Sequence, residues 1–244
     1  MFLSVDPLAE KYPNTNPYVF VANNPIMFID DDGRDYRVFF NSATKTVTIK
    51  ATYYALGKDM ESAKKAVDYW NNQSGQFNYT VGRRENAVTY AVNFELSAIE
   101  VDVDPQLGER GSLNDASRQD FSGGANLYTV DNTGLDPNTN GTTVGGNYIK
   151  VKDTQADTDT GSHEVGHTLG LKHNRRGLMT PASTDSSRSS SINANDISDM
   201  IQYPAKGKVN SERNSEGNIM RAGRGTINND TNFRMNDIKN GKAQ

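Results

Sequence analysis

Hydrophobic and polar positions alternate along two stretches early in the chain, Tyr36–Phe40 and Thr46–Tyr54. Alternation with a period of two is typical of a strand that buries one face, and the short polar connection at residues 41–44 suits a tight turn. The two stretches therefore predict a β-hairpin. Other alternating or β-branched stretches predict further strands at residues 77–81, 87–103, 125–131 and 147–152.

Apolar residues spaced three or four positions apart predict helices with one buried face. One such helix covers residues 59–72, where Asp59 is the candidate N-cap. Its buried stripe is expected to consist of Met60, Ala63, Val67 and Trp70. Another helix begins at a cap on Asn193, which is followed by an acidic residue in the first helical turn. Its buried residues are expected to be Ile197, Met200 and Ile201.

Two polar segments are predicted to lack regular structure. Residues 104–124 are rich in Asp, Gly and Ser and predict a loop. Beyond Pro204 the chain carries eight Lys or Arg against four Asp or Glu, which predicts a polar basic tail, disordered or loosely draped, at 204–244. The chain is therefore expected to have three parts, with boundaries at 1–34, 35–203 and 204–244.

Composition narrows the classes of partner. The net charge is −4, so neither a nucleic-acid surface nor a membrane surface is expected. The chain has 0 Cys, which excludes disulfides and thiolate chemistry. Residues 1–20 lack the pattern of a signal peptide, and no apolar run is long enough to span a bilayer. Export would therefore depend on another part of a larger protein.

The candidate chemistry lies in residues 163–173, which read H-E-x-x-H-x-x-G-x-x-H and contain all 3 His of the chain. On a helix that starts near Asp157 or Asp159, residues four apart share a face, so His163 and His167 can bind one ion with Glu164 beside them.

Glycine adopts a left-handed backbone at low cost, so Gly170 is expected to end this helix and to let His173 return as a third ligand. Three neutral nitrogens and an open fourth position suit catalytic zinc. The alternative is a solvated helix whose histidines happen to have helical spacing.

This segment resembles the zinc signature of the metzincin metalloproteases. That family also has a Met-turn, in which a methionine lies under the metal, and Gly177-Leu178-Met179-Thr180-Pro181 resembles the form found in matrixins. Met220 is the alternative candidate for this methionine. The resemblance implies an α+β fold in which a mixed twisted sheet carries an active-site helix, a Met-turn and a C-terminal helix at residues 192–202.

The resemblance implies a zinc endopeptidase that hydrolyses peptide bonds in a protein or peptide substrate. Zinc on the three histidines would lower the pKa of a bound water to about 7, and Glu164 would move the proton. Met179 would contribute shape rather than bonds.

In metzincins an edge strand above the zinc helix binds the substrate backbone. By order in the chain, the candidate residues for this role are Leu127, Tyr128, Thr129 and Val130. The alternative is that these residues form an ordinary internal strand.

Two aspartate-rich stretches, Asp102–Asp115 and Asp131–Asp136, are candidate Ca²⁺ sites because calcium prefers oxygen ligands. Solvated turns, in which aspartate bonds to nearby backbone groups, are the alternative for both stretches.

Residues 1–34 resemble the closing segment of the RHS repeat-associated core, whose shell encloses variable C-terminal toxin domains in bacteria. The residues that carry this resemblance are Ser4–Pro13, Asn24-Pro25 and Phe28-Ile29-Asp30. It implies a toxin or effector domain, exported or delivered to a target cell as part of a larger bacterial protein, with an immunity protein as a candidate partner.

Two other functional hypotheses remain open on the sequence. One is a zinc-binding docking module without turnover. The other is a detached gene end that no longer functions, which is suggested by the place of Met1 inside the RHS-like segment.

Overall fold

The structure, a computed structural model, describes most of the chain after residue 34. The described residues are 35–120, 124–174, 176–181, 189–208, 211–213, 217–229 and 234–244. The RHS-like segment at residues 1–34 lies outside them.

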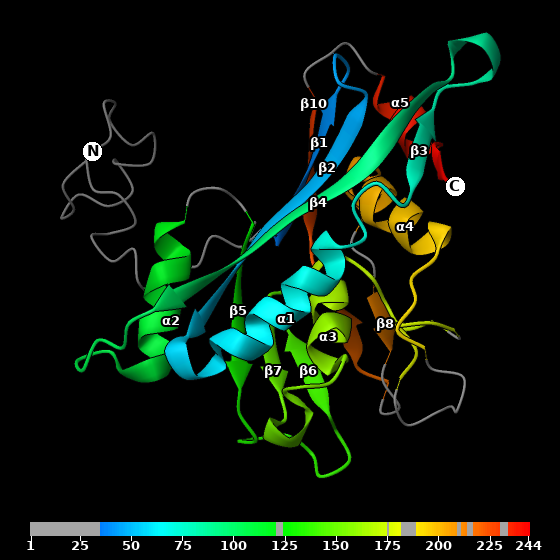
Figure 1. Ribbon diagram of the computed structural model, residues 1–244. Coiled ribbons are helices and arrows are strands. Elements are labelled where there is room, and N and C mark those ends of the chain that lie inside the picture. The colour runs from blue at the N-terminus through cyan, green and yellow to red at the C-terminus, as the bar shows by residue number, and fades with distance from the viewer. Residues whose placement is uncertain are drawn as a thin grey trace, which may run out of the picture. The chain divides into compact units, whose positions relative to one another are not determined.

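Nine strands of the described residues form one mixed sheet at the centre of the fold (Figure 1). The predicted hairpin is confirmed, since β1 (Tyr36–Asn41) runs antiparallel to β2 (Thr46–Leu56). The other strands are β3 (Asn78–Val81), β4 (Val88–Val101), β5 (Ala125–Val130), β6 (Gly141–Val144), β7 (Tyr148–Val151), β10 (Gly225–Asn229) and β11 (Lys242–Ala243). Their order is β11-β3-β4-β2-β5-β7-β6, while β1 pairs with both β2 and β10.

The sheet combines parallel and antiparallel pairs, and β3 and β4 are antiparallel at the end away from β6. The strand β2 pairs in parallel with β4 and with β5, and β5 pairs in parallel with β7. The edge strand β6 instead runs antiparallel to β7. Together with the helices described next, this mixed sheet is compatible with the predicted α+β fold.

One face of the sheet carries the main core. Alternate residues of β2 are buried, as the sequence pattern predicts, while the residues between them are partly exposed. The helices α1 (Met60–Asn71), α3 (Thr160–Thr168) and α4 (Ala194–Ala205) contribute to the same apolar cluster. Trp70 of α1 is fully buried, and its Nε1 donates to the carbonyl of Ser162 at 2.9 Å. The predicted stripe of α1 is thus core, and Trp70 helps to hold α3 in place.

Helix ends follow the predicted caps in part. Asn193 and Asp196 form a capping box at the start of α4, because each side chain accepts the backbone N–H of the other residue. Asp59 occupies the N-cap position of α1, but its side chain makes no capping hydrogen bond.

The loop prediction for residues 104–124 is wrong. This segment contains α2 (Gly108–Gln119), which packs on the other face of the sheet. Its buried residues are only Ser112 and Leu113, and Leu113 contacts Leu56 and Leu127. A helix with one buried apolar residue has no apolar period, so its sequence gives no helical signal.

The prediction of a solvated tail at residues 204–244 is also wrong. Arg34–Gln244 form one compact unit, in which β10 pairs in parallel with β1 and β11 pairs with β3. The same segment contains β8 (Ser211–Arg213), β9 (Ile219–Arg221) and α5 (Met235–Lys239). The strands β10 and β11 join the main sheet through backbone hydrogen bonds, which composition does not reveal. None of the described helices is both long and apolar enough to cross a membrane.

The carboxyl group of Asp35 makes stability depend on pH. Asp35 is 3% exposed, its Oδ2 accepts the N–H of Arg224 at 2.6 Å, and burial raises its pKa from 3.8 to about 7. The folded state therefore holds a proton that the unfolded chain releases near pH 4. Stability from this group is present below that pH and is lost as the pH rises towards 7.

We expect Asp35→Asn to remove this pH dependence, since an amide does not titrate. Between pH 4 and pH 7 the unfolding free energy of the wild type should fall by a few kcal/mol relative to that of the variant. Each pH unit between the pKa values of the unfolded and folded states contributes about 1.4 kcal/mol. Urea unfolding of both proteins in the presence of a chelator measures the difference without a metal contribution. Parallel curves for the two proteins would contradict the expectation.

Candidate metal centre

The helix α3, which carries the motif, is enclosed by the fold. Its buried residues are Thr160, Gly161, Ser162, His163, Glu164, Val165, Gly166 and Thr168. Gly161 allows close packing on α1, because a Cβ at this position would overlap the Tyr128 hydroxyl and lie 3.1 Å from Cβ of Ala66. A solvated surface helix, the alternative that the sequence leaves open, does not agree with this burial.

The helix ends as the sequence predicts, at Gly170. This residue has φ of 85°, its N–H donates to the carbonyl of His167, and the N–H of Leu171 donates to the carbonyl of Gly166. The pair of bonds is a Schellman motif, in which a left-handed glycine reverses the chain. The reversal brings His173 back towards the helix.

The three histidines converge through their Nε2 atoms. The Nε2 of His167 lies 3.1 Å from that of His163 and 3.3 Å from that of His173. These are the only described residues that form a group of three or more metal-ligand side chains within 4.8 Å of one another. Tetrahedral zinc with Zn–N bonds of about 2.0–2.1 Å holds its nitrogens about 3.3–3.4 Å apart, so the spacing fits this ion.

Backbone carbonyls orient two of the rings. The Nδ1 of His163 lies 2.7 Å from the Leu178 carbonyl, and the Nδ1 of His167 lies 2.8 Å from the Leu171 carbonyl. A carbonyl can only accept, so each Nδ1 carries the proton and each Nε2 presents its lone pair to the centre. Burial, and then the two other histidines, hold the pKa of His167 well below its usual value, so this ring is neutral at neutral pH.

The third ring has a different partner. The Nδ1 of His173 lies 2.6 Å from Oε1 of Glu212, which belongs to β8. No pattern in the sequence indicates this residue, because it lies in the segment predicted to be a solvated tail.

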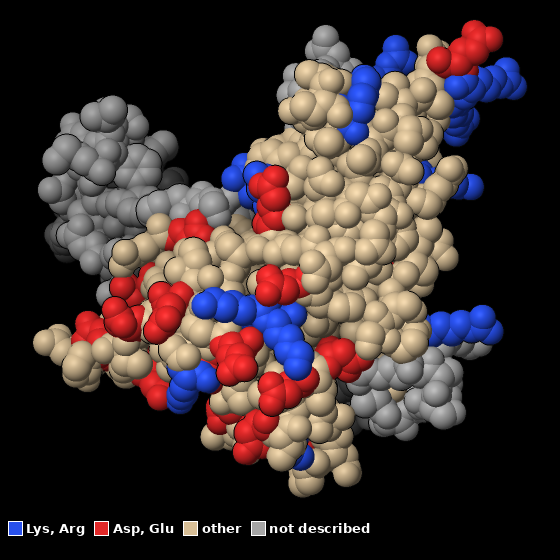
Figure 2. Space-filling model, in the orientation of Figure 1, with Lys and Arg blue, Asp and Glu red and all other residues tan. Residues whose placement is uncertain are grey.

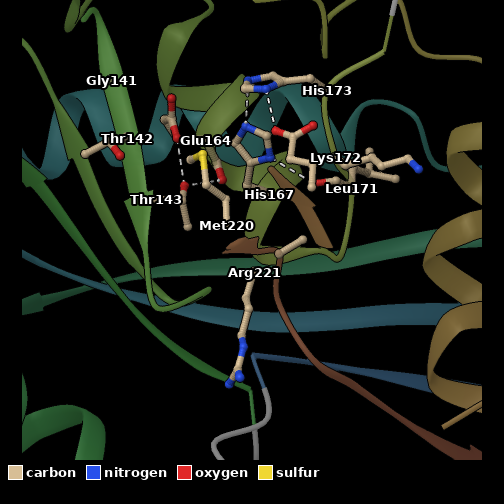
Figure 3. A pocket seen from close by; sticks show the side chains of 12 residues that line it. Gly141, Thr142, Thr143, Glu164, His167, Leu171, Lys172, His173, Met220 and Arg221 are labelled. Atoms are coloured by element: carbon tan, nitrogen blue, oxygen red, sulfur yellow. Dashed lines mark hydrogen bonds and ion pairs between the residues drawn. The ribbon is translucent and has the colours of Figure 1, made fainter. Parts of the chain in front are cut away.

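Glu164 lies beside the histidines with its carboxyl group held by the edge strand. It is 4% exposed, and Oγ1 of Thr143 donates to its Oε2 at 2.7 Å. Figure 3 shows this contact next to His167. Gly141, also in β6, lies so close that a Cβ there would come 2.9 Å from Oε1 of Glu164. The strand β6 therefore sets the position of the predicted catalytic carboxylate.

The two candidate methionines occupy different places. Met179 is fully buried against α3, and a Cβ on Gly166 would overlap its sulfur. The carbonyl of the preceding Leu178 accepts from His163, so this turn contacts the metal centre directly. Met220 is 36% exposed and lines the open pocket. The geometry favours Met179 for the buried position.

A pocket opens over the histidines (Figure 3). Its lining combines β6, the end of α3 and the turn after it, and residues of β8 and β9. The lining residues are Gly141, Thr142, Thr143, Glu164, His167, Leu171, Lys172, His173, Glu212, Met220, Arg221 and Ala222.

The edge-strand prediction for Leu127, Tyr128, Thr129 and Val130 is wrong. These residues belong to β5, an internal strand between β2 and β7. The edge strand is β6, within a segment that the sequence suggested to be turns. The pair Gly145-Gly146 could have revealed this strand, because it lies between the strand-forming residues Val144 and Tyr148. Such a pattern is typical of a hairpin. Both glycines have positive φ, 67° and 94°.

Among the described residues, no three carboxylates lie close enough together to share an ion, in either of the candidate calcium stretches or elsewhere. Side chains of these stretches accept local hydrogen bonds instead, from the N–H of Thr133 to Asp131 and from the N–H of Asn138 to Asp136. The backbone bond from Thr133 is the first cause that lowers the pKa of Asp131 to about 2. Figure 2 shows that acidic side chains gather in this region with Lys and Arg among them, as on a solvated surface.

No protein-family model and no curated protein matches this chain. A function must therefore be inferred from the geometry of the centre and from the sequence motifs.

Proposed function

We propose that the protein is a zinc-dependent endopeptidase of the metzincin type. The observation that carries the proposal is the convergence of three Nε2 atoms beside the buried carboxylate of Glu164. Neutral imidazoles that present three lone pairs to one point are ligands that zinc prefers, and a site with three protein ligands leaves a position for water and substrate.

The roles follow from position. When bound, zinc would supply an acidified water and polarise the substrate carbonyl. Glu164 would accept the proton of that water and deliver it to the leaving amine. The hydrogen bond from Thr143 to Oε2 holds this carboxyl group beside the histidines. Met179 packs closely against α3 at Gly166, where there is no room for a side chain.

The edge strand β6 is the proposed site for the substrate backbone. No described strand pairs with its outer edge, and its residues Gly141, Thr142 and Thr143 line the pocket. An extended peptide can add to such an edge through main-chain hydrogen bonds, independently of its side chains. This proposal moves the predicted substrate contact from β5 to β6.

The biological context remains a proposal that rests on residues 1–34. Their resemblance to the end of an RHS core supports an effector domain that is delivered as part of a larger bacterial protein. An immunity protein that covers the pocket would be the corresponding partner.

We expect the full chain to hydrolyse casein or gelatin, to lose this activity when a chelator removes the metal, and to regain it when zinc is added back. Metal content determined in parallel shows whether zinc binds at one equivalent. Protein that holds zinc but cleaves neither substrate would favour the docking module. Folded protein that binds no zinc would contradict the proposal itself, and an unfolded chain would favour the detached gene end.

A further inference from the structure

Each Nδ1 of the centre has a partner among the described residues, and the partner of His173 is the one furthest away in the chain. The partners of His163 and His167 are backbone carbonyls of the helix end and of the following turn. These carbonyls keep their positions as long as α3 and its turn are folded. His173 instead lies in the segment without regular structure after α3, and its acceptor is the carboxylate of Glu212.

We propose that Glu212 is a positioning residue of the metal centre, and that the β8–β9 hairpin completes the centre by holding this carboxylate against His173. The inference rests on the proposed zinc site. It assigns a role to a segment that the sequence predicts to be solvated.

The geometry of the hairpin supports this role. In the antiparallel register of β8 and β9, Glu212 lies directly opposite Met220. Opposite residues of such a pair project from the same face, and both of these line the pocket over the histidines. Figure 3 shows that Arg221, the next residue of β9, extends away from the histidines. The hairpin thus turns a carboxylate and a thioether towards the centre and a cation away from it.

The residues after the hairpin are fixed to the zinc helix itself. The N–H of Gly223 donates to the carbonyl of His167 at 2.7 Å. A Cβ at Gly223 would overlap the backbone of Thr168, so only glycine allows this close approach. The N–H of Arg224 then donates to Asp35, and β10 continues as a partner of β1. This anchoring limits the positions that Glu212 can adopt.

The charge of Glu212 also suits the centre. Three neutral imidazoles leave the two positive charges of Zn²⁺ uncompensated, and Glu164 supplies one negative charge beside them. Glu212 supplies a second through the ring of His173. The side chains of His173 and Glu212 are 30% and 24% exposed, so solvent screens their bond only in part. A carboxylate at Nδ1 fixes the tautomer of a histidine ligand and makes its other nitrogen a better donor.

The test compares Glu212→Gln and Glu212→Ala with the wild type by zinc competition against a chelating indicator. Loss of an outer partner of a metal-bound histidine typically weakens binding by 10–100-fold, so we expect about this loss for alanine. A smaller loss is expected for glutamine, which keeps an acceptor oxygen but not the charge. The visible spectrum of the Co²⁺-loaded proteins should change in both variants, because it responds to the geometry and donor strength of the ligands.

Glu109→Gln is the matched control, since it makes the same change at an exposed carboxylate that pairs with Lys58. Zinc affinities within about twofold of the wild type in both Glu212 variants, with unchanged cobalt spectra, would overturn the proposal. If the alanine variant does not fold by circular dichroism, the nearly isosteric glutamine variant decides.

The result is independent of proteolysis. Weakened zinc binding in a protein that cleaves no substrate would support the role of Glu212 and count against the endopeptidase. A folded wild type that binds no zinc would remove both.

Discussion

Replacement of Glu164 by glutamine is expected to reduce peptide-bond hydrolysis to a small residual rate while the metal stays bound. Glutamine has nearly the same shape and can still accept from Thr143, so the packing against β6 should survive. It cannot accept a proton from water at neutral pH. General acid–base catalysis typically contributes 10²–10⁴-fold, and we expect kcat to fall by about this factor.

The measurement is casein hydrolysis with metal content determined on the same samples. Glu109→Gln, which alters an exposed carboxylate away from the pocket, should keep the full rate. A Glu164→Gln protein that retains zinc and hydrolyses at the wild-type rate would refute the assignment of Glu164 as the base.

The His167→Ala substitution is expected to remove metal binding and, with it, all activity. His167 is the central candidate ligand, because its Nε2 lies within 3.3 Å of both other Nε2 atoms. Burial keeps its imidazole neutral, so in the wild type no proton competes with the metal at neutral pH. Loss of a direct ligand should weaken zinc binding by more than the 10–100-fold that is typical for an outer partner.

Equilibrium dialysis against buffered zinc measures this loss. Circular dichroism of the metal-free proteins shows whether the variant keeps its fold, as expected from the core around Trp70, which involves no metal. All 3 His of the chain belong to the centre, so the chelator-treated wild type is the appropriate reference. Wild-type zinc affinity in the variant would contradict the ligand assignment.

Features that depend on residues close in the chain could be predicted from the sequence. The hairpin of β1 and β2 follows from alternation, and the end of α3 follows from the single left-handed glycine, Gly170. The three histidines converge because helical spacing and one turn are enough to bring them together. Each of these features needs only a short stretch of chain.

Features that depend on distant pairing could not be predicted in this way. Whether β5 or β6 lies at the edge is decided by the order of strands in the sheet, which the side-chain pattern of neither strand encodes. Thr143 reaches Glu164 only through that order. Glu212 reaches His173 only because the segment after α4 folds back over the centre. The polar composition of this segment predicts a solvated tail, but strand pairing and a close glycine contact require little apolar surface.

The parallel pairing of β10 with β1 has a consequence for the order of folding. Tyr36 pairs with Gly225, so most of the described chain lies between the two paired strands. Closing so long a loop is slow, because few conformations bring its ends together. The hydrogen bonds of the helix with His163 and His167 join residues close in the chain, whereas the carboxylate partner of His173 lies in the segment that leads to β10. During synthesis the centre would therefore stay incomplete until the C-terminal strands have paired. The strand order of the sheet thus determines when the site is complete.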